Sequence, residues 1–129
     1  MATRERTKAA ARREARAARG PHASLRWLRI SPRKVRLVVD MIRGQDVEEA
    51  LNLLNFSPKA ASEPVGKLLR SAVANADNKG DYDLDKLFVK IAFVDEGPTW
   101  RRWQPRAMGR ATRIRKRTSH VTLELAERQ

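Results

Sequence analysis

The segment that decides how this chain is built is G-P-T-W-R-R-W-Q-P-R-A-M-G-R-A-T-R-I-R-K-R, Gly97–Arg117. It holds eight Lys and Arg residues, two tryptophans and no Asp or Glu. Such a segment cannot form a hydrophobic core by itself, and its like charges repel one another in a free protein. The natural compensation is a polyanion, whose condensed counterions are released when arginines take their place. The composition therefore predicts a nucleic-acid partner.

Arginine and tryptophan together favour RNA over other polyanions. Guanidinium groups bind phosphates in bidentate fashion, and indole rings stack on bases that are exposed in loops and bulges. The alternative is structural: Trp100 and Trp103 could clamp the segment against itself. The eight cations beside them favour the RNA interpretation.

Two stretches typical of β-strands flank this segment. Leu87–Val94 is β-branched and aromatic, and Val121–Leu125 alternates apolar and polar residues. The roughly 25 residues between them are too many for an ordinary hairpin loop. If both strands continue outward as a two-stranded ribbon, it reaches about 40 Å at roughly 3.3 Å per residue. Pro98 and Pro105 prevent full pairing along that ribbon, and Gly109 permits a bend or bulge.

A first helix is predicted over residues 32–43. Ser31-Pro32 supplies an N-cap followed by proline at the first helical position, and valines then recur at helical spacing. Arg33, Lys34 and Arg36 lie in the first turns, where the helix macrodipole disfavours cations. A bound phosphate would relieve this conflict, so we expect these residues to contact RNA.

Two more helices follow. Residues 46–56 have one apolar face, and Asp46 and Glu49 form a predicted capping box. Ser57-Pro58 repeats the cap-and-proline pattern before an apolar stripe of five turns. Pro64 is expected to interrupt or kink that third helix.

The amino-terminal part of the chain divides in two. Residues 23–30 mix Leu, Trp and Ile with arginines, which suits a short strand. Residues 1–20 contain no apolar side chain larger than Ala except Met1, so we predict a disordered basic arm. A solvated helix is the alternative, because Ala and Arg favour helix. A transit peptide would also be rich in Arg, but Glu5 and Glu14 count against it.

These elements predict an α+β fold: a small three-stranded sheet packed on three helices, with a long protruding β-hairpin and a basic N-terminal arm. The expected parts are the arm (1–22), the globular body (23–94 with 118–127) and the extended hairpin (95–117). The formal net charge of +13 is distributed accordingly. Residues 45–96 carry −4 and residues 97–117 carry +8, so the basic parts are appendages to a mildly acidic body.

The sequence lacks the residues that several classes of protein require. There is no cysteine, which fits a reducing compartment and removes disulfides and thiolate metal sites. No apolar run approaches the roughly 20 residues that span a bilayer, and the amino end lacks a secretory signal, so we expect a cytosolic protein with no membrane partner. Asp81, Asp83 and Asp85 alternate but lack the glycine and glutamate of a calcium loop. We expect no metal and no cofactor.

Two other functions fit parts of the sequence less well. A ribonuclease would need paired imidazoles, but nothing places His22 and His120 together, so no enzyme is expected. A DNA-binding helix-turn-helix could use the helices at 32–43 and 46–56. Its recognition helix would then carry acidic residues and no Lys or Arg, which argues against this alternative.

Separated blocks of the sequence resemble a known family. They are D-E-G-P at Asp95–Pro98, P-R-A-M-G-R-A at Pro105–Ala111, K-R-T-S-H-V-T-L at Lys116–Leu123 and S-P-R-K-V-R-L-V-V-D-M-I-R-G at Ser31–Gly44. From about residue 25 to residue 125 the chain resembles the bacterial family of large-subunit ribosomal protein twenty-two. The resemblance implies a small α/β body and a long β-hairpin that passes through large-subunit rRNA to line the nascent-peptide tunnel.

The resemblance also implies partners and site residues. The partners would be 23S rRNA, neighbouring large-subunit proteins and the nascent polypeptide, in a cytoplasmic ribosome and without homo-oligomers; the protein would also aid subunit assembly. Residues expected to bind RNA, including those inferred from charge, are Arg26, Arg33, Lys34, Arg36, Trp100, Arg101, Arg102, Trp103, Arg106, Gly109, Arg110, Arg113, Arg115, Lys116 and Arg117. The tunnel-lining hairpin tip would comprise Arg101, Arg102, Trp103, Gln104, Pro105, Arg106, Ala107 and Met108. Pro105, Ala107 and Gly109 would set its shape, whereas Met108 stands where many relatives carry a cation.

Overall fold

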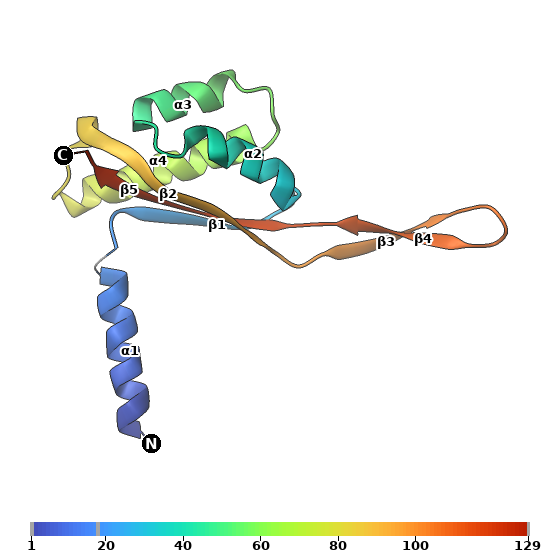
Figure 1. Cartoon of the computed structure of the whole chain (residues 1–129), viewed down its shortest axis with the longest axis horizontal. Helices are drawn as coiled ribbons and strands as arrows, with labels where there is room; N and C mark the ends of the chain where they lie inside the picture. The colour runs from blue at the N-terminus through green and yellow to red at the C-terminus, as the bar shows by residue number, and fades with distance from the viewer. Residues whose placement is uncertain (1, 18, 129) are drawn as a thin grey trace.

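A computed structural model describes residues 2–17 and 19–128 of the chain, and its described part has the expected α+β class (Figure 1). The elements in chain order are α1 (Ala2–Ala17), β1 (His22–Leu28), α2 (Pro32–Ile42), α3 (Val47–Phe56), α4 (Ser62–Lys79), the short 3₁₀ helix η1 (Leu84–Lys86), β2 (Leu87–Glu96), β3 (Trp100–Pro105), β4 (Ala111–Lys116) and β5 (Ser119–Glu127).

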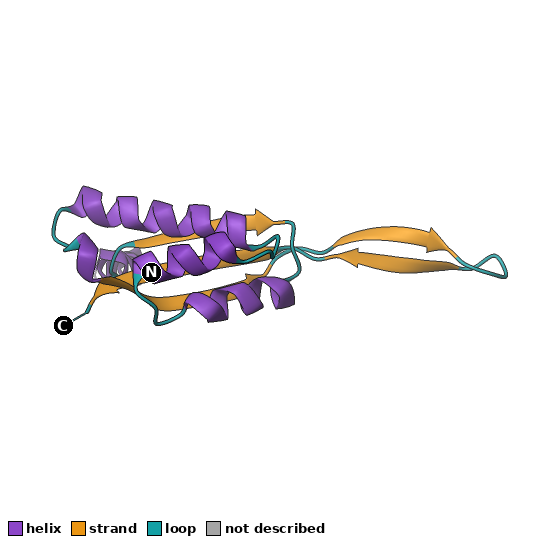
Figure 2. Ribbon diagram, turned by 90° about the horizontal axis from the view of Figure 1, so that it is seen from above, coloured by secondary structure: helices purple, strands orange, loops and turns teal. Residues whose placement is uncertain are grey.

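The body is a three-stranded antiparallel sheet with helices on one face. The strand order is β1-β5-β2, so β5 lies in the centre. Its side chains alternate: Val121, Leu123 and Leu125 are fully buried, whereas Thr122 and Glu124 between them, and His120 before them, face away from the core. Helices α2, α3 and α4 cover the buried face, and the other face has no such cover (Figures 1 and 2). The predicted strands and the helical layer are confirmed.

The core lies between this sheet and the three helices. Val35, Val38, Val39 and Ile42 of α2 are completely buried, as the helical spacing of the sequence predicts. Helix α4 adds Val65 and Leu69 along its inner side. Each large aliphatic side chain buried in this way stabilises the folded state by about 1.5 to 3 kcal/mol.

At three helix starts, the structure differs from the capping pattern that the sequence predicts. The Ser31 hydroxyl makes no cap hydrogen bond, although Ser31 does precede α2. The capping box at Asp46 is wrong, because that carboxylate makes no cap bond. It instead forms an ion pair at 2.9 Å with Arg128, beyond the end of β5.

The third helix begins later than the Ser57-Pro58 pattern predicts. Ser57 ends α3, with its backbone N–H donating to the carbonyl of Leu53 at 3.1 Å. Helix α4 starts at Ser62, so Pro64 is its third residue. The prediction that Pro64 interrupts or kinks the helix is wrong, because an amide in the first turn has no intrahelical acceptor and proline costs little there.

The amino-terminal arm is helical over residues 2–17, so the predicted disorder is wrong there. The alternative prediction, a solvated helix, agrees with the structure. The high helix propensity of Ala and Arg accounts for this. Figure 1 shows α1 extending away from the body, on the side of the sheet opposite to α2, α3 and α4. Met1 and Ala18 of the predicted arm lie outside the described residues.

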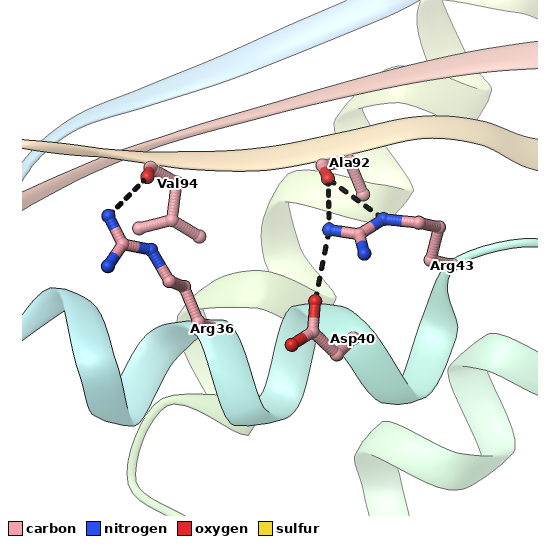
Figure 3. Close-up of polar contacts among 5 residues, drawn as sticks. All are labelled: Arg36, Asp40, Arg43, Ala92 and Val94. Atoms are coloured by element: carbon pink, nitrogen blue, oxygen red, sulfur yellow. Dashed lines mark hydrogen bonds and ion pairs between the residues drawn. The ribbon is translucent and has the colours of Figure 1, made fainter.

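The outer edge of β2 is covered rather than exposed. The Gly44 N–H donates to the Val89 carbonyl at 2.9 Å, and the Val89 N–H donates to the Gln45 carbonyl at 3.0 Å. Farther along, Arg43 donates twice to the Ala92 carbonyl, at 2.7 and 3.2 Å, and Arg36 donates to the Val94 carbonyl at 3.2 Å (Figure 3). Covered edges protect a sheet from pairing with another chain.

Within residues 2–17 and 19–128, no helix has the length and apolar character needed to cross a membrane.

Candidate nucleic-acid interface

The Gly97–Arg117 segment forms the predicted two-stranded ribbon, which projects from one end of the body (Figure 2). Strands β3 and β4 pair antiparallel from Trp100 opposite Lys116 to Pro105 opposite Ala111. The ribbon side chains are exposed except for Ile114, which is half-buried. The ribbon thus has no apolar core of its own, and an isolated ribbon of this kind is marginal in water.

Each face of the ribbon presents one tryptophan among cations. Directly opposed residues of an antiparallel pair share a face, so the register assigns them. One face carries Trp103 and Arg113 beside Arg101 and Arg115, and the other carries Trp100, Lys116, Arg102 and Ile114. The two indoles therefore lie on opposite faces and cannot clamp against each other. Their exposed fractions are 52% for Trp100 and 61% for Trp103.

Like charges on the ribbon lie close together and destabilise it in the free protein. Arg101 lies directly opposite Arg115, and like charges in that position destabilise a pair of strands. The Arg113 guanidinium lies 5.0 Å from the ring centre of Trp103, which partly offsets the repulsion by a cation–π contact. An anion between the arginines would remove the remaining repulsion.

The neck of the ribbon is closely fitted. The Gly97 N–H donates to the Thr118 carbonyl at 2.9 Å, and the Thr118 hydroxyl donates to the Pro98 carbonyl at 2.6 Å. A Cβ at Gly97 would lie 2.4 Å from the Thr118 hydroxyl oxygen, so only glycine fits. The buried Ser119 hydroxyl also donates to the Ile30 carbonyl at 3.1 Å. These contacts fix the direction in which the ribbon leaves the sheet.

The tip is a tight turn. The Arg106 N–H donates to the Arg110 carbonyl at 2.8 Å, and both Met108 and Gly109 have left-handed backbone conformations. The bend predicted at Gly109 is confirmed. Met108 is 91% exposed, so it is the most prominent apolar group of the tip.

A basic hollow of about 470 Å³ lies where the ribbon meets the body. Its lining is Arg29, Ser31, Trp100, Arg102, Arg115, Lys116, Arg117 and Thr118. None of these described residues is acidic, so the hollow suits a phosphate group. Arg29 was not predicted as a contact residue, because it is separated from the ribbon by about 70 residues; its place two residues after Trp27, in the predicted basic strand 23–30, was the available signal.

A second hollow of about 360 Å³ is partly neutralised. Four arginines of the ribbon line it together with Thr99 and Glu96, the last residue of β2. The Glu96 carboxylate lies 3.7 Å from the Arg117 guanidinium. Because the predicted cationic segment begins one residue later, this ion pair was not anticipated. Arg117 is therefore less available to a ligand than the other ribbon arginines.

The predicted contact residues of the body are also exposed. Arg26 lies in β1, and Arg33 and Lys34 lie in the first turn of α2, at the end of the body from which the ribbon emerges (Figure 1). Arg36 differs because its guanidinium donates to the β2 edge (Figure 3). This structural contact was not expected for Arg36.

The remaining polar clusters have structural roles. The His120 Nδ1 accepts a hydrogen bond at 3.1 Å from the backbone N–H of Trp27. Asp83 caps η1 and pairs with Lys86 at 3.1 Å, and this hydrogen bond holds the pKa of Asp83 below its usual value. Among residues 2–17 and 19–128, no group of three His, Asp or Glu side chains could hold a metal ion.

Comparison with known proteins agrees with this geometry. The model of the family described as ribosomal protein L22p/L17e matches residues 23–126. The chain is 60% identical over 107 residues to the large ribosomal subunit protein uL22 of Desulfitobacterium hafniense (strain DSM 10664 / DCB-2), covering 83% of this chain and 94% of that protein. It is 58% identical over 118 residues to the uL22 protein of Anaeromyxobacter sp. (strain Fw109-5), covering 91% of this chain and 82% of that protein. The chain belongs to the ribosomal protein L22p/L17e family.

Proposed function

We propose that this protein is a structural constituent of the large ribosomal subunit that binds 23S rRNA through its ribbon, aids subunit assembly and lines the polypeptide exit tunnel. It acts in the cytoplasm, as part of the ribosome. The observation that carries the proposal is the two-faced ribbon, β3 and β4, with a tryptophan and cations on each face. Such an element suits a site where RNA surrounds it on both sides.

Electrostatic attraction between the ribbon cations and RNA phosphates is the main source of the proposed binding. Each ribbon cation that approaches a phosphate releases condensed counterions, which favours association at low salt. Opposed guanidinium groups such as Arg101 and Arg115 can take one phosphate between them. Binding then turns the repulsion in the free ribbon into an attraction, so the ribbon gains order from the RNA.

The tryptophans and the tip have separate tasks in this proposal. Trp100 and Trp103, on opposite faces, stack on unpaired bases on either side of the ribbon. The tip, residues 101–108, faces the tunnel and the nascent polypeptide. The exposed Met108 offers passing chains an adaptable apolar contact.

Neighbouring large-subunit proteins would contact the body, whose residues 45–96 carry an excess of acidic side chains. No homo-oligomer and no catalytic role form part of the proposal. His120 supports this view, because its Nδ1 is occupied by the Trp27 N–H. Helix α3 likewise argues against a DNA-binding helix-turn-helix, because Glu48 and Glu49 lie in its first turn and it carries no Lys or Arg.

The proposal is tested by binding of the purified full chain to 23S rRNA fragments and to duplex DNA of equal length. We expect tighter binding to the RNA, with an affinity that falls steeply as salt rises. The matched variant replaces residues 97–118 by Asn-Gly, a two-residue turn that suits the antiparallel pair Glu96 and Ser119. It should keep the folded body and lose most RNA affinity. Equal affinity of the variant, or preference for DNA, would refute the proposal.

A further inference from the structure

Trp27 has a backbone conformation that a bulky residue rarely adopts. Its φ is +63°, in the left-handed region, where side chains other than that of glycine are strained. It lies in a bulge of β1, between Leu25 and Leu28, where the register with β5 shifts. Strained residues persist only where their surroundings hold them, and they gather at functional positions.

His120 is the group that holds Trp27. The Trp27 N–H donates to the His120 Nδ1 at 3.1 Å, and the two rings meet edge to face with centroids 5.2 Å apart. His120 lies on the face of the sheet that α2, α3 and α4 leave uncovered. The indole is nevertheless 60% exposed, and no group within the described part of the chain accepts a hydrogen bond from its ring N–H. The fold fixes this ring in place and leaves it uncovered.

The neighbourhood of Trp27 joins it to the proposed RNA interface. Arg26 in β1 and Arg29, just after the end of β1, are exposed, and Arg29 lines the basic hollow that also contains Trp100. Helix α1, which is rich in arginine, leaves the body on the same side of the sheet (Figure 1). The uncovered sheet face therefore lies between two cationic appendages. A polyanion that binds both appendages passes over this face.

The chemistry directly at Trp27 suits a base rather than a phosphate. The partner of His120 across the ladder to β2 is Asp95, an exposed carboxylate that repels phosphate groups. An indole face is indifferent to that charge and stacks on any unpaired base, whereas the arginines on either side of it reach the phosphates of the same strand.

We propose that Trp27, held by His120 in the β1 bulge, is a stacking site for an unpaired RNA base, separate from the ribbon. This inference rests on the proposed rRNA binding and names a second contact of that RNA on the open face of the sheet. The nucleotide stacks on the exposed indole, and Arg26 and Arg29 neutralise its flanking phosphates.

The test is the affinity for 23S rRNA fragments across a salt series. Trp27→Gly removes the ring at a backbone conformation that glycine adopts readily. We expect the dissociation constant to rise about 5- to 100-fold, the usual effect of losing one base stack. The slope of affinity against salt should stay unchanged, because no charge is removed. The control is Phe56→Ala, which removes an aromatic ring that is 87% exposed on α3; its affinity should equal that of the wild type.

A second pair of variants keeps the test decisive if Trp27→Gly disturbs the fold. Trp27→Phe keeps an aromatic face and should bind nearly as the wild type, whereas Trp27→Leu keeps apolar bulk without a π face and should bind more weakly. Equal binding by the Phe and Leu variants overturns the inference while leaving ribbon binding intact. If the wild type fails to bind rRNA at all, the proposed function itself fails.

Discussion

Gly97 shows how much one residue decides in this molecule. It lies at the neck of the ribbon, where its N–H bonds to the Thr118 carbonyl. We predict that Gly97→Ala lowers the free energy of unfolding by about 1–3 kcal/mol, because the new methyl group would lie 2.4 Å from the Thr118 hydroxyl and 3.2 Å from the His120 ring. Urea denaturation followed by circular dichroism measures this.

The control for that substitution is Gly66→Ala in α4. A Cβ there meets no atom within 4 Å apart from its chain neighbours and the backbone of its own helix, and the residue is helical. This change should raise the free energy of unfolding by about 0.4–1 kcal/mol, because alanine restricts the unfolded chain and favours helix. A Gly97→Ala protein as stable as the wild type would contradict the fitted neck.

Arg43 is the second residue with a testable structural role. It donates two hydrogen bonds to the Ala92 carbonyl and pairs with Asp40 at 3.0 Å (Figure 3). We predict that Arg43→Ala lowers the free energy of unfolding by about 1–2 kcal/mol, because the partly buried carbonyl loses its charged donor. Thermal or urea unfolding measures the change. Arg33→Ala, at an exposed position in the first turn of α2, should change it by under about 0.5 kcal/mol; equal effects would contradict this role.

Individual side-chain contacts were the features that the sequence predicted least well. Asp46 and Glu49 had the spacing of a capping box, yet Asp46 pairs with Arg128, which is distant in sequence. Local patterns report which helix can start nearby, but a carboxylate binds whichever donor the folded chain brings to it. The same limit hid the role of Arg36 at the β2 edge.

At the scale of elements, the ribbon makes a quantitative prediction. Arg101→Ala and Arg113→Ala should each flatten the dependence of log affinity for rRNA on log salt by at most about 0.9, because each removes one phosphate contact. The matched control is Lys67→Ala on α4, whose ammonium already pairs with Glu63 at 2.8 Å. Its slope should equal that of the wild type. Slopes that do not change in the ribbon variants would contradict the electrostatic account.

Helix α1 should contribute to binding but not to stability. It extends away from the body, and its sequence offers no side chain for a core (Figure 1). We predict that removing residues 1–17 changes the free energy of unfolding by less than about 0.5 kcal/mol, while weakening rRNA binding and flattening its salt slope. Parallel urea denaturation and salt-dependent binding measure both. A clear loss of stability would contradict the view of α1 as an appendage.

The elements themselves were largely predictable. Alternation in β5 and helical spacing in α2 each identify a buried face, because core burial imposes its own period on the sequence. The start of α4 was missed, since Ser57-Pro58 resembles a helix start but ends α3 instead. The disorder expected for the arm was wrong for residues 2–17, because helix propensity there requires no tertiary partner.

At the scale of the whole molecule, charge and core are kept apart. The sheet and three helices bury the apolar residues, while the ribbon and α1 carry cations away from them (Figure 1). The segment charges predicted this division. What they could not predict is the Trp27 site, because it depends on a bulge and on a histidine that is distant in sequence. Strand pairing across the whole fold creates that neighbourhood.

The central claim is that the ribbon anchors this protein in the large ribosomal subunit. The most direct measurement is the amount of protein in salt-washed large subunits, from cells that express either the full chain or the variant with Asn-Gly in place of residues 97–118. We predict near one copy per subunit for the full chain and a loss of about tenfold or more for the variant, which keeps its folded body. Equal occupancy by both proteins would contradict the account.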